Sequence, residues 1–178
     1  MEAETEDVLP VLPQGRLVAE NLTRSPAVFV ENCVFRRNRA RGVLLTCKNA
    51  LVENCLFETS GAAVYLEGEA EYWYESGAVR ELIFRKNRFV DCSYVPEWGG
   101  APIVACPKVT CGEGSFFHGR VVLEENEFSC FDERLLQLRQ VGEICMKKNR
   151  YIATKTYPKK PGKRFDIAEC GSFQEDWG

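Results

Sequence analysis

The sequence is poor in the residues that most enzyme active sites use. Its 178 residues include one histidine, His118, and only five aspartates: Asp7, Asp91, Asp132, Asp166 and Asp176. A lone histidine without clustered partners is typical of a packing or capping residue and argues against a metal site. We therefore expect no metal and no cofactor, and the residues alone indicate no catalytic group.

The sequence also lacks a long apolar run, a secretory leader and an excess of basic residues. No stretch approaches the roughly 20 apolar residues of a membrane-spanning helix. The segment from Met1 to Asp7 is rich in acidic residues, whereas a secretory leader begins with basic and then apolar residues. A net charge of −3 argues against a nucleic-acid partner. With 45% apolar and 28% charged residues, the composition predicts a folded globular chain with no membrane span.

Cysteine is abundant, but its spacing supports neither a disulfide framework nor a zinc site. The nine cysteines are odd in number, and the close pair Cys106 and Cys111 has no matching second pair. We predict free thiols, most of them buried in the core. Such thiols suit a reducing compartment, or a protein that never meets an oxidase.

One short phrase occurs five times along the chain. Two β-type apolar residues are followed by Cys or Asn, and then by an aromatic ring. The five copies are Val28-x-Val30-x-x-Cys33-x-Phe35, Ala50-x-Val52-x-x-Cys55-x-Phe57, Leu82-x-Phe84-x-x-Asn87-x-Phe89, Val121-x-Leu123-x-x-Asn126-x-Phe128 and Ile144-x-Met146-x-x-Asn149-x-Tyr151. The rings are 22, 32, 39 and 23 residues apart. The short intervals fit one coil of a solenoid, and the long ones fit a coil with an inserted loop.

The repeat predicts an all-β parallel β-helix, or solenoid, of about five coils. Each coil buries its apolar side chains by stacking on its neighbours, so the same positions are apolar in every turn. Asn suits the corner between strands because it tolerates left-handed backbone, and stacked Asn amides form a hydrogen-bonded ladder. We therefore interpret Asn87, Asn126 and Asn149 as structural residues.

A second strand is expected after each corner, and its alternation separates an inner from an outer face. The inner set is Val43, Leu45, Val64, Leu66, Ile103, Ala105, Leu136 and Leu138. The outer set is Leu44, Thr46, Tyr65, Glu67, Gln137 and Arg139. This mixed polar and aromatic stripe is a natural surface for a saccharide.

The whole chain is expected to form one β-helix domain. Residues 1–20 are a leader, 21–155 form the coils, and 156–178 form a loop and a partial last coil. Because the coils begin and end near the termini without evident caps, we expect the chain to be part of a longer solenoid.

Two segments carry a resemblance to a known family. The run Asn38-Arg39-Ala40-Arg41-Gly42 and the loop containing Trp73, Glu75, Ser76 and Gly77 resemble glycoside hydrolase family 110, in register over about residues 20–155. The resemblance implies a bacterial inverting α-galactosidase that acts on terminal α-1,3-linked galactose and is built on a right-handed parallel β-helix. An exported, periplasmic or extracellular, full-length protein is implied as well.

The resemblance does not bring a catalytic pair with it. An inverting glycosidase needs two carboxyl groups roughly 6.5–9.5 Å apart, one as general acid and one as general base. The resemblance implies that this pair consists of two aspartates on coils earlier than the matched segment. None of the five aspartates here lies in a matching motif. We therefore expect this chain alone to be inactive and to supply one wall of the sugar cleft.

The candidate substrate-binding residues lie on two neighbouring coils: Arg39, Arg41, Glu67, Glu69, Trp73 and Glu75. Sugar recognition needs a flat ring against the apolar face of the sugar, and charged groups at its hydroxyls. The alternative for the loop is a shield over the solenoid. The alternative for Arg39 and Arg41 is a salt bridge with Glu67 or Glu53.

Two hypotheses from different classes result. The chain is either part of an α-galactosidase whose catalytic pair lies upstream, or a non-catalytic β-helix module that binds glycans or extends a scaffold. In both, carbohydrate is the expected partner, and the oligomeric state is left open.

Overall fold

A computed structural model shows an all-β chain whose strands pair in parallel. It describes residues 23, 25–68, 77–108, 111–112 and 114–177. The strands form three parallel stacks, in which each strand pairs with strands one turn of the chain away. This topology is compatible with a parallel β-helix, as the repeat predicted.

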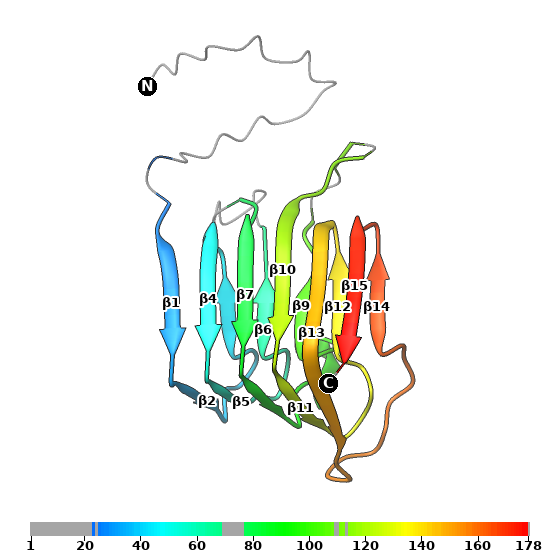
Figure 1. The fold of residues 1–178 in the computed structure, drawn as a ribbon. Coiled ribbons are helices and arrows are strands. Elements are labelled where there is room, and N and C mark those ends of the chain that lie inside the picture. The colour runs from blue at the N-terminus through cyan, green and yellow to red at the C-terminus, as the bar shows by residue number, and fades with distance from the viewer. Residues whose placement is uncertain (1–22, 24, 69–76, 109–110, 113, 178) are drawn as a thin grey trace, which may run out of the picture.

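The strands of the first stack lie side by side and point in the same direction in Figure 1. It consists of β1 (Ala27–Glu31), β4 (Asn49–Glu53), β7 (Glu81–Arg85), β10 (His118–Glu124), β13 (Val141–Ala153) and β15 (Ser172–Trp177). The second stack consists of β2 (Val34–Arg36), β5 (Leu56–Glu58), β8 (Arg88–Val90), β11 (Glu127–Cys130) and the end of β13. The third consists of β3 (Val43–Leu45), β6 (Val64–Leu66), β9 (Ile103–Ala105), β12 (Leu136–Arg139) and β14 (Phe165–Ala168). A short 3-10 helix, η2 (Pro96–Trp98), precedes β9.

The core lies between the three stacks and follows the repeat. Phe35, Phe57, Phe89 and Phe128 form one column of stacked rings with centroid separations of 4.9, 5.2 and 4.8 Å. Tyr151 pairs in register with Phe128 and continues the column. The predicted inner residues of the third stack are buried, and only Val43, in the first strand of that stack, is partly exposed.

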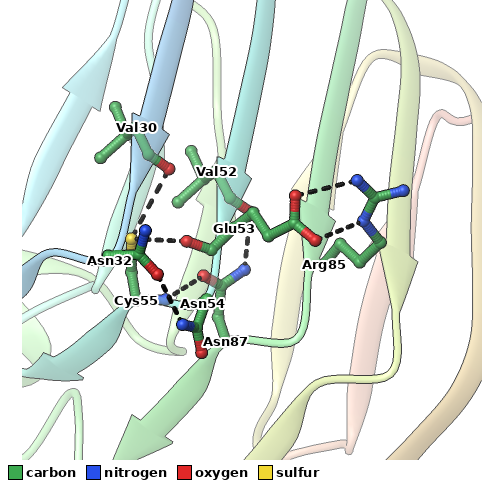
Figure 2. A network of polar contacts seen from close by, with 8 residues as sticks. All are labelled: Val30, Asn32, Val52, Glu53, Asn54, Cys55, Arg85 and Asn87. Atoms are coloured by element: carbon green, nitrogen blue, oxygen red, sulfur yellow. Dashed lines mark hydrogen bonds and ion pairs between the residues drawn. The ribbon is translucent and has the colours of Figure 1, made fainter.

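The predicted asparagine ladder is present and fully buried. Asn126 Oδ1 accepts the backbone N–H of Asn87 at 2.9 Å, and Asn149 Oδ1 accepts that of Asn126 at 3.0 Å. Each amide nitrogen donates to a carbonyl of the preceding coil; Asn87 Nδ2 bonds to Val52 O at 2.9 Å (Figure 2). These bonds satisfy backbone groups that the corner takes out of the strand pairing.

Cysteine replaces asparagine at the first ladder positions. The Cys55 N–H donates to Asn87 Oδ1 at 2.9 Å, so the ladder reaches this coil, as Figure 2 shows. Cys55 Sγ accepts the Cys33 N–H at 3.4 Å and lies 3.6 Å from Val30 O. The thiol thus takes the place of the amide with longer and weaker contacts.

The left-handed residue at each corner is not the ladder residue, which corrects the sequence expectation. It is the residue immediately before: Asn32 (φ 56°), Asn54 (φ 51°), Lys86 (φ 56°), Glu125 (φ 53°) and Lys148 (φ 50°). The ladder position is therefore chosen for its side-chain hydrogen bonds, and the turn itself is made one residue earlier.

Burial of the cysteines follows their place in the stacks. All nine are free thiols; Cys55, Cys92, Cys130 and Cys145 are buried. Cys33 lies at the predicted corner but is exposed, because β1 lies at the edge of its stack. Burial raises the pKa of Cys92 to about 11.

His118 at the start of β10 is a packing residue, as predicted from its isolation. Its side chain is 1% exposed, and Nδ1 accepts the Val79 N–H at 3.3 Å. Burial, with a smaller contribution from the charge of Lys48, lowers the pKa of His118 to about 4.

Candidate carbohydrate-binding surface

The candidate site lies on the outer face of the third stack. Residues Leu44, Tyr65, Val104, Gln137 and Asp166 are aligned across five neighbouring strands. Their neighbours along each strand are apolar and face the core, since side chains alternate along a strand. The row therefore places an aromatic ring, an amide and a carboxylate on the outward side of the stack, with the buried Val104 between Tyr65 and Gln137.

Arg41 and Tyr65 form the best-defined contact of this surface. The Arg41 guanidinium carbon lies 4.5 Å from the centre of the Tyr65 ring. Within the described part of the chain, the buried Arg41 Nε has no hydrogen-bond partner. Burial raises the pKa of the Tyr65 phenol, so this hydroxyl remains a neutral donor and acceptor.

A second outward row lies two residues further along the chain than Tyr65 and Gln137. Glu67 directly follows β6 and is partly exposed, whereas Arg139 ends β12. Arg139 Nη2 lies 2.9 Å from both carboxylate oxygens of Asp166. This hydrogen bonding raises the pKa of Arg139 and fixes the Asp166 carboxylate on the outer face.

The structure places three of the six predicted substrate-binding residues. Arg41 and Glu67 lie on the outward face on either side of Tyr65, while Arg39 is exposed at the preceding corner. The interpretation of a salt bridge from these arginines to Glu53 is wrong, because Glu53 is held by Arg85 through two bonds of 2.9 Å (Figure 2). Glu69, Trp73 and Glu75 lie outside the described residues.

The flanks of the 69–76 segment are fixed to the body of the protein. Lys48 Nζ, in a buried side chain, donates to the Ala78 carbonyl at 2.7 Å. On the other side, Gly68 is packed so closely against the Phe117 ring that an added Cβ would meet it at 2.0 Å. The described residues on both sides of the 69–76 segment are therefore held in place by the body of the protein.

Sequence reasoning missed Tyr65 as a site residue, although it placed the ring on the outer face. The available signal was the register: Tyr65 pairs with Leu44, so it lies one coil above the Arg39–Gly42 corner. A ring that stacks on a charged guanidinium from the neighbouring coil is stabilised and held flat.

Neither a membrane span nor a metal cluster appears in the part of the chain that the structure describes. No helix there has the length and apolar character needed to cross a membrane. No three His, Cys, Asp or Glu side chains come together there in an arrangement suited to a metal ion.

These features define an all-β protein of stacked parallel strands that exposes polar and aromatic groups on one outer face. Comparison with known proteins adds the family. No family model matches the chain. It is 40% identical over 139 residues to an α-1,3-galactosidase B of Phocaeicola vulgatus, covering 73% of the chain and 24% of that protein. It is 33% identical over 147 residues to an α-1,3-galactosidase A of Bacteroides fragilis, covering 80% and 24%.

A third relative aligns with almost the entire chain. An α-1,3-galactosidase B of Akkermansia muciniphila is 32% identical over 178 residues, covering 97% of the chain and 22% of that protein. These matches confirm the predicted resemblance to glycoside hydrolase family 110: the chain is related to its bacterial α-1,3-galactosidases over most of its length. The chain spans about a quarter of the length of these relatives.

Proposed function

We propose that the chain is part of an inverting glycosidase that removes terminal α-linked galactose from glycans. The observation that carries the proposal is the match to proteins named α-1,3-galactosidases at 32–40% identity over most of the chain. The parallel pairing of all three stacks supports a parallel β-helix as its fold, and the family resemblance implies that this helix is right-handed. An exported full-length protein is part of the same proposal.

In this proposal the outer face of the third stack forms one wall of the substrate cleft. Tyr65 offers a ring that is held flat by Arg41, and Glu67 offers a partly exposed carboxylate beside it. A ring that packs against C–H groups of a sugar, with charged groups at its hydroxyls, is the usual chemistry of saccharide recognition. The predicted residues Arg39, Glu69, Trp73 and Glu75 would extend this wall.

The catalytic carboxyl pair is proposed to come from sequence beyond this chain. Asp132 is buried and bound by Arg134 at 2.7 and 3.1 Å, and Asp166 is bound by Arg139. A general acid and a general base need free carboxyl oxygens facing a sugar and a water. Two carboxylates engaged by arginines are poor candidates for either role.

Two measurements on the 178-residue chain test the proposal. With a chromogenic α-galactoside we expect no turnover, because the catalytic pair is missing; robust hydrolysis would show that the pair lies within the chain. In a calorimetric titration with α-1,3-galactobiose, we expect weak binding that Tyr65→Ala weakens further. The matched control is Phe29→Ala, which removes an exposed ring on β1, outside the third stack. Absence of binding by the unmodified chain would favour a scaffold module.

A further inference from the structure

A pocket lies beyond the Tyr65 surface, on the later strands of the third stack. It has a volume of about 310 Å³, enough for one sugar ring. Gln137 of β12 and Asp166 of β14 line it, together with Arg134 just before β12. Its remaining lining comes from Gly100, Ala101, Leu136 and the segment Pro161–Lys163.

Two segments far apart in the sequence wall the pocket and are tied to each other. The first contains Tyr94 and leads to Gly100; the second contains Tyr157 and leads to Pro161. The Tyr94 and Tyr157 rings stack at 4.8 Å, and Lys160 Nζ donates to the Tyr94 carbonyl. Because these contacts join the walls, the pocket is preformed and binding would cost little ordering.

The polar groups of the pocket are held in place with hydrogen-bonding capacity to spare. Arg134 is oriented by Asp132, which takes its Nε and Nη2 donors at 3.1 and 2.7 Å. Its remaining nitrogen, Nη1, lies 4.0 Å from the place a Cβ on Gly100 would take. Gln137 Oε1 lies 2.9 Å from the same point, so the absence of a side chain at residue 100 keeps the pocket open.

The charges at the pocket floor are balanced within the protein. Asp132 balances Arg134, and Arg139 balances Asp166. Lys163 in the wall adds one positive charge, whereas the floor presents donors and acceptors whose charges are paired, with the Pro161 ring and Ala101 as apolar surface. This chemistry suits a neutral polyol, whose hydroxyl groups both donate and accept.

We propose that this pocket binds a second, neutral hexose residue of the same glycan, which rests on the proposed function of the Tyr65 surface. Tyr65 on β6 and Gln137 on β12 are aligned with one strand, β9, between them. Two strand spacings amount to about 10 Å, a separation that a short oligosaccharide spans. The protein would thus recognise a galactosyl chain beyond its terminal sugar.

Residue-resolved ¹H–¹⁵N NMR titrations of the 178-residue chain test the pocket, with galactose, α-1,3-galactobiose and galacturonate as probes. We expect galactose and galactobiose to shift the amides of Gln137 and Asp166, with a Kd on the order of 1 mM. Gly100→Leu fills the pocket and should remove these shifts while those around Tyr65 remain. Gln137→Ala should weaken binding about threefold to tenfold, since it removes one hydrogen-bonding group.

The control variant and the results that would contradict the pocket differ from those that test the proposed function. Gln174→Ala truncates an exposed glutamine on β15 and should change nothing. Shifts around Tyr65 without shifts at Gln137 would overturn this inference and leave the proposed function intact. Shifts at Gln137 alone would support the pocket and count against the Tyr65 surface. Tighter binding of galacturonate than of galactose at Gln137 would overturn the assignment of a neutral sugar.

Discussion

The buried asparagine ladder allows a quantitative test, for which Asn126→Ala is the sharpest change. The substitution removes Oδ1, which accepts both the backbone N–H and the Nδ2 of Asn87 at 2.9 and 3.1 Å. It also removes the donor to Phe84 O at 2.9 Å. Each buried group left without a partner costs about 1–3 kcal/mol, so we expect a loss of about 3–5 kcal/mol in the free energy of unfolding.

Two companion variants separate the hydrogen bonds from the loss of side-chain volume. Asn126→Cys copies the residue found at Cys55, whose thiol makes the same kind of contacts at 3.4 and 3.6 Å. We expect it to cost roughly 1–3 kcal/mol, because sulfur is a weak partner. Asn32→Gly removes an exposed amide that accepts from Asn54 at 2.6 Å, and glycine tolerates the left-handed φ of 56° at this corner, so the change should cost less than about 0.5 kcal/mol.

Urea denaturation followed by circular dichroism measures these differences, since the midpoint shifts in proportion to stability when the slope is unchanged. The reasoning would be refuted by equal, small losses for Asn126→Ala and Asn32→Gly. That result would mean that water reaches the ladder and replaces its bonds, despite the complete burial of Asn126.

The remaining predictions concern two kinds of titratable side chain. Because the pKa of His118 is about 4 in the folded chain and about 6.5 when unfolded, the unfolded chain binds the proton first. Stability is therefore full above about pH 6.5 and falls by up to about 3 kcal/mol toward pH 4; a fall of equal size in His118→Gln would contradict this. In alkylation near pH 8 followed by mass spectrometry, exposed Cys33 should react in the folded chain, whereas Cys92 should react only after unfolding. Equal labelling of both thiols would argue against the burial of Cys92.

The sequence predicted those features that every coil must repeat. Asn87, Asn126 and the phenylalanine column could be read from spacing alone, because a side chain that stacks on its own copy must recur in each turn. The left-handed residue was placed one position too late. Lys86 and Glu125 make that turn, and neither residue type signals a left-handed conformation.

The candidate surface was only partly predictable. Glu67 was assigned to the outer face from the alternation of its strand, whereas Arg41 was selected from the run that carries the family resemblance. The pocket at Gln137 could not be found in this way, because its walls come from segments around Tyr94 and Tyr157. Their meeting depends on how two long connections fold over the strands, and no periodic pattern records that.

The ladder also bears on how such a chain can evolve. Its bonds join residues 23, 32 or 39 positions apart with the same geometry, since the chain returns to the same corner whatever lies between. A connection can therefore lengthen without altering the frame. Under the proposed function, an insertion such as the one after Gly68 is where substrate preference would change, while Asn87 and its stacked partners maintain the coil. Binding specificity and structural stability are thus open to separate selection in different parts of one repeat.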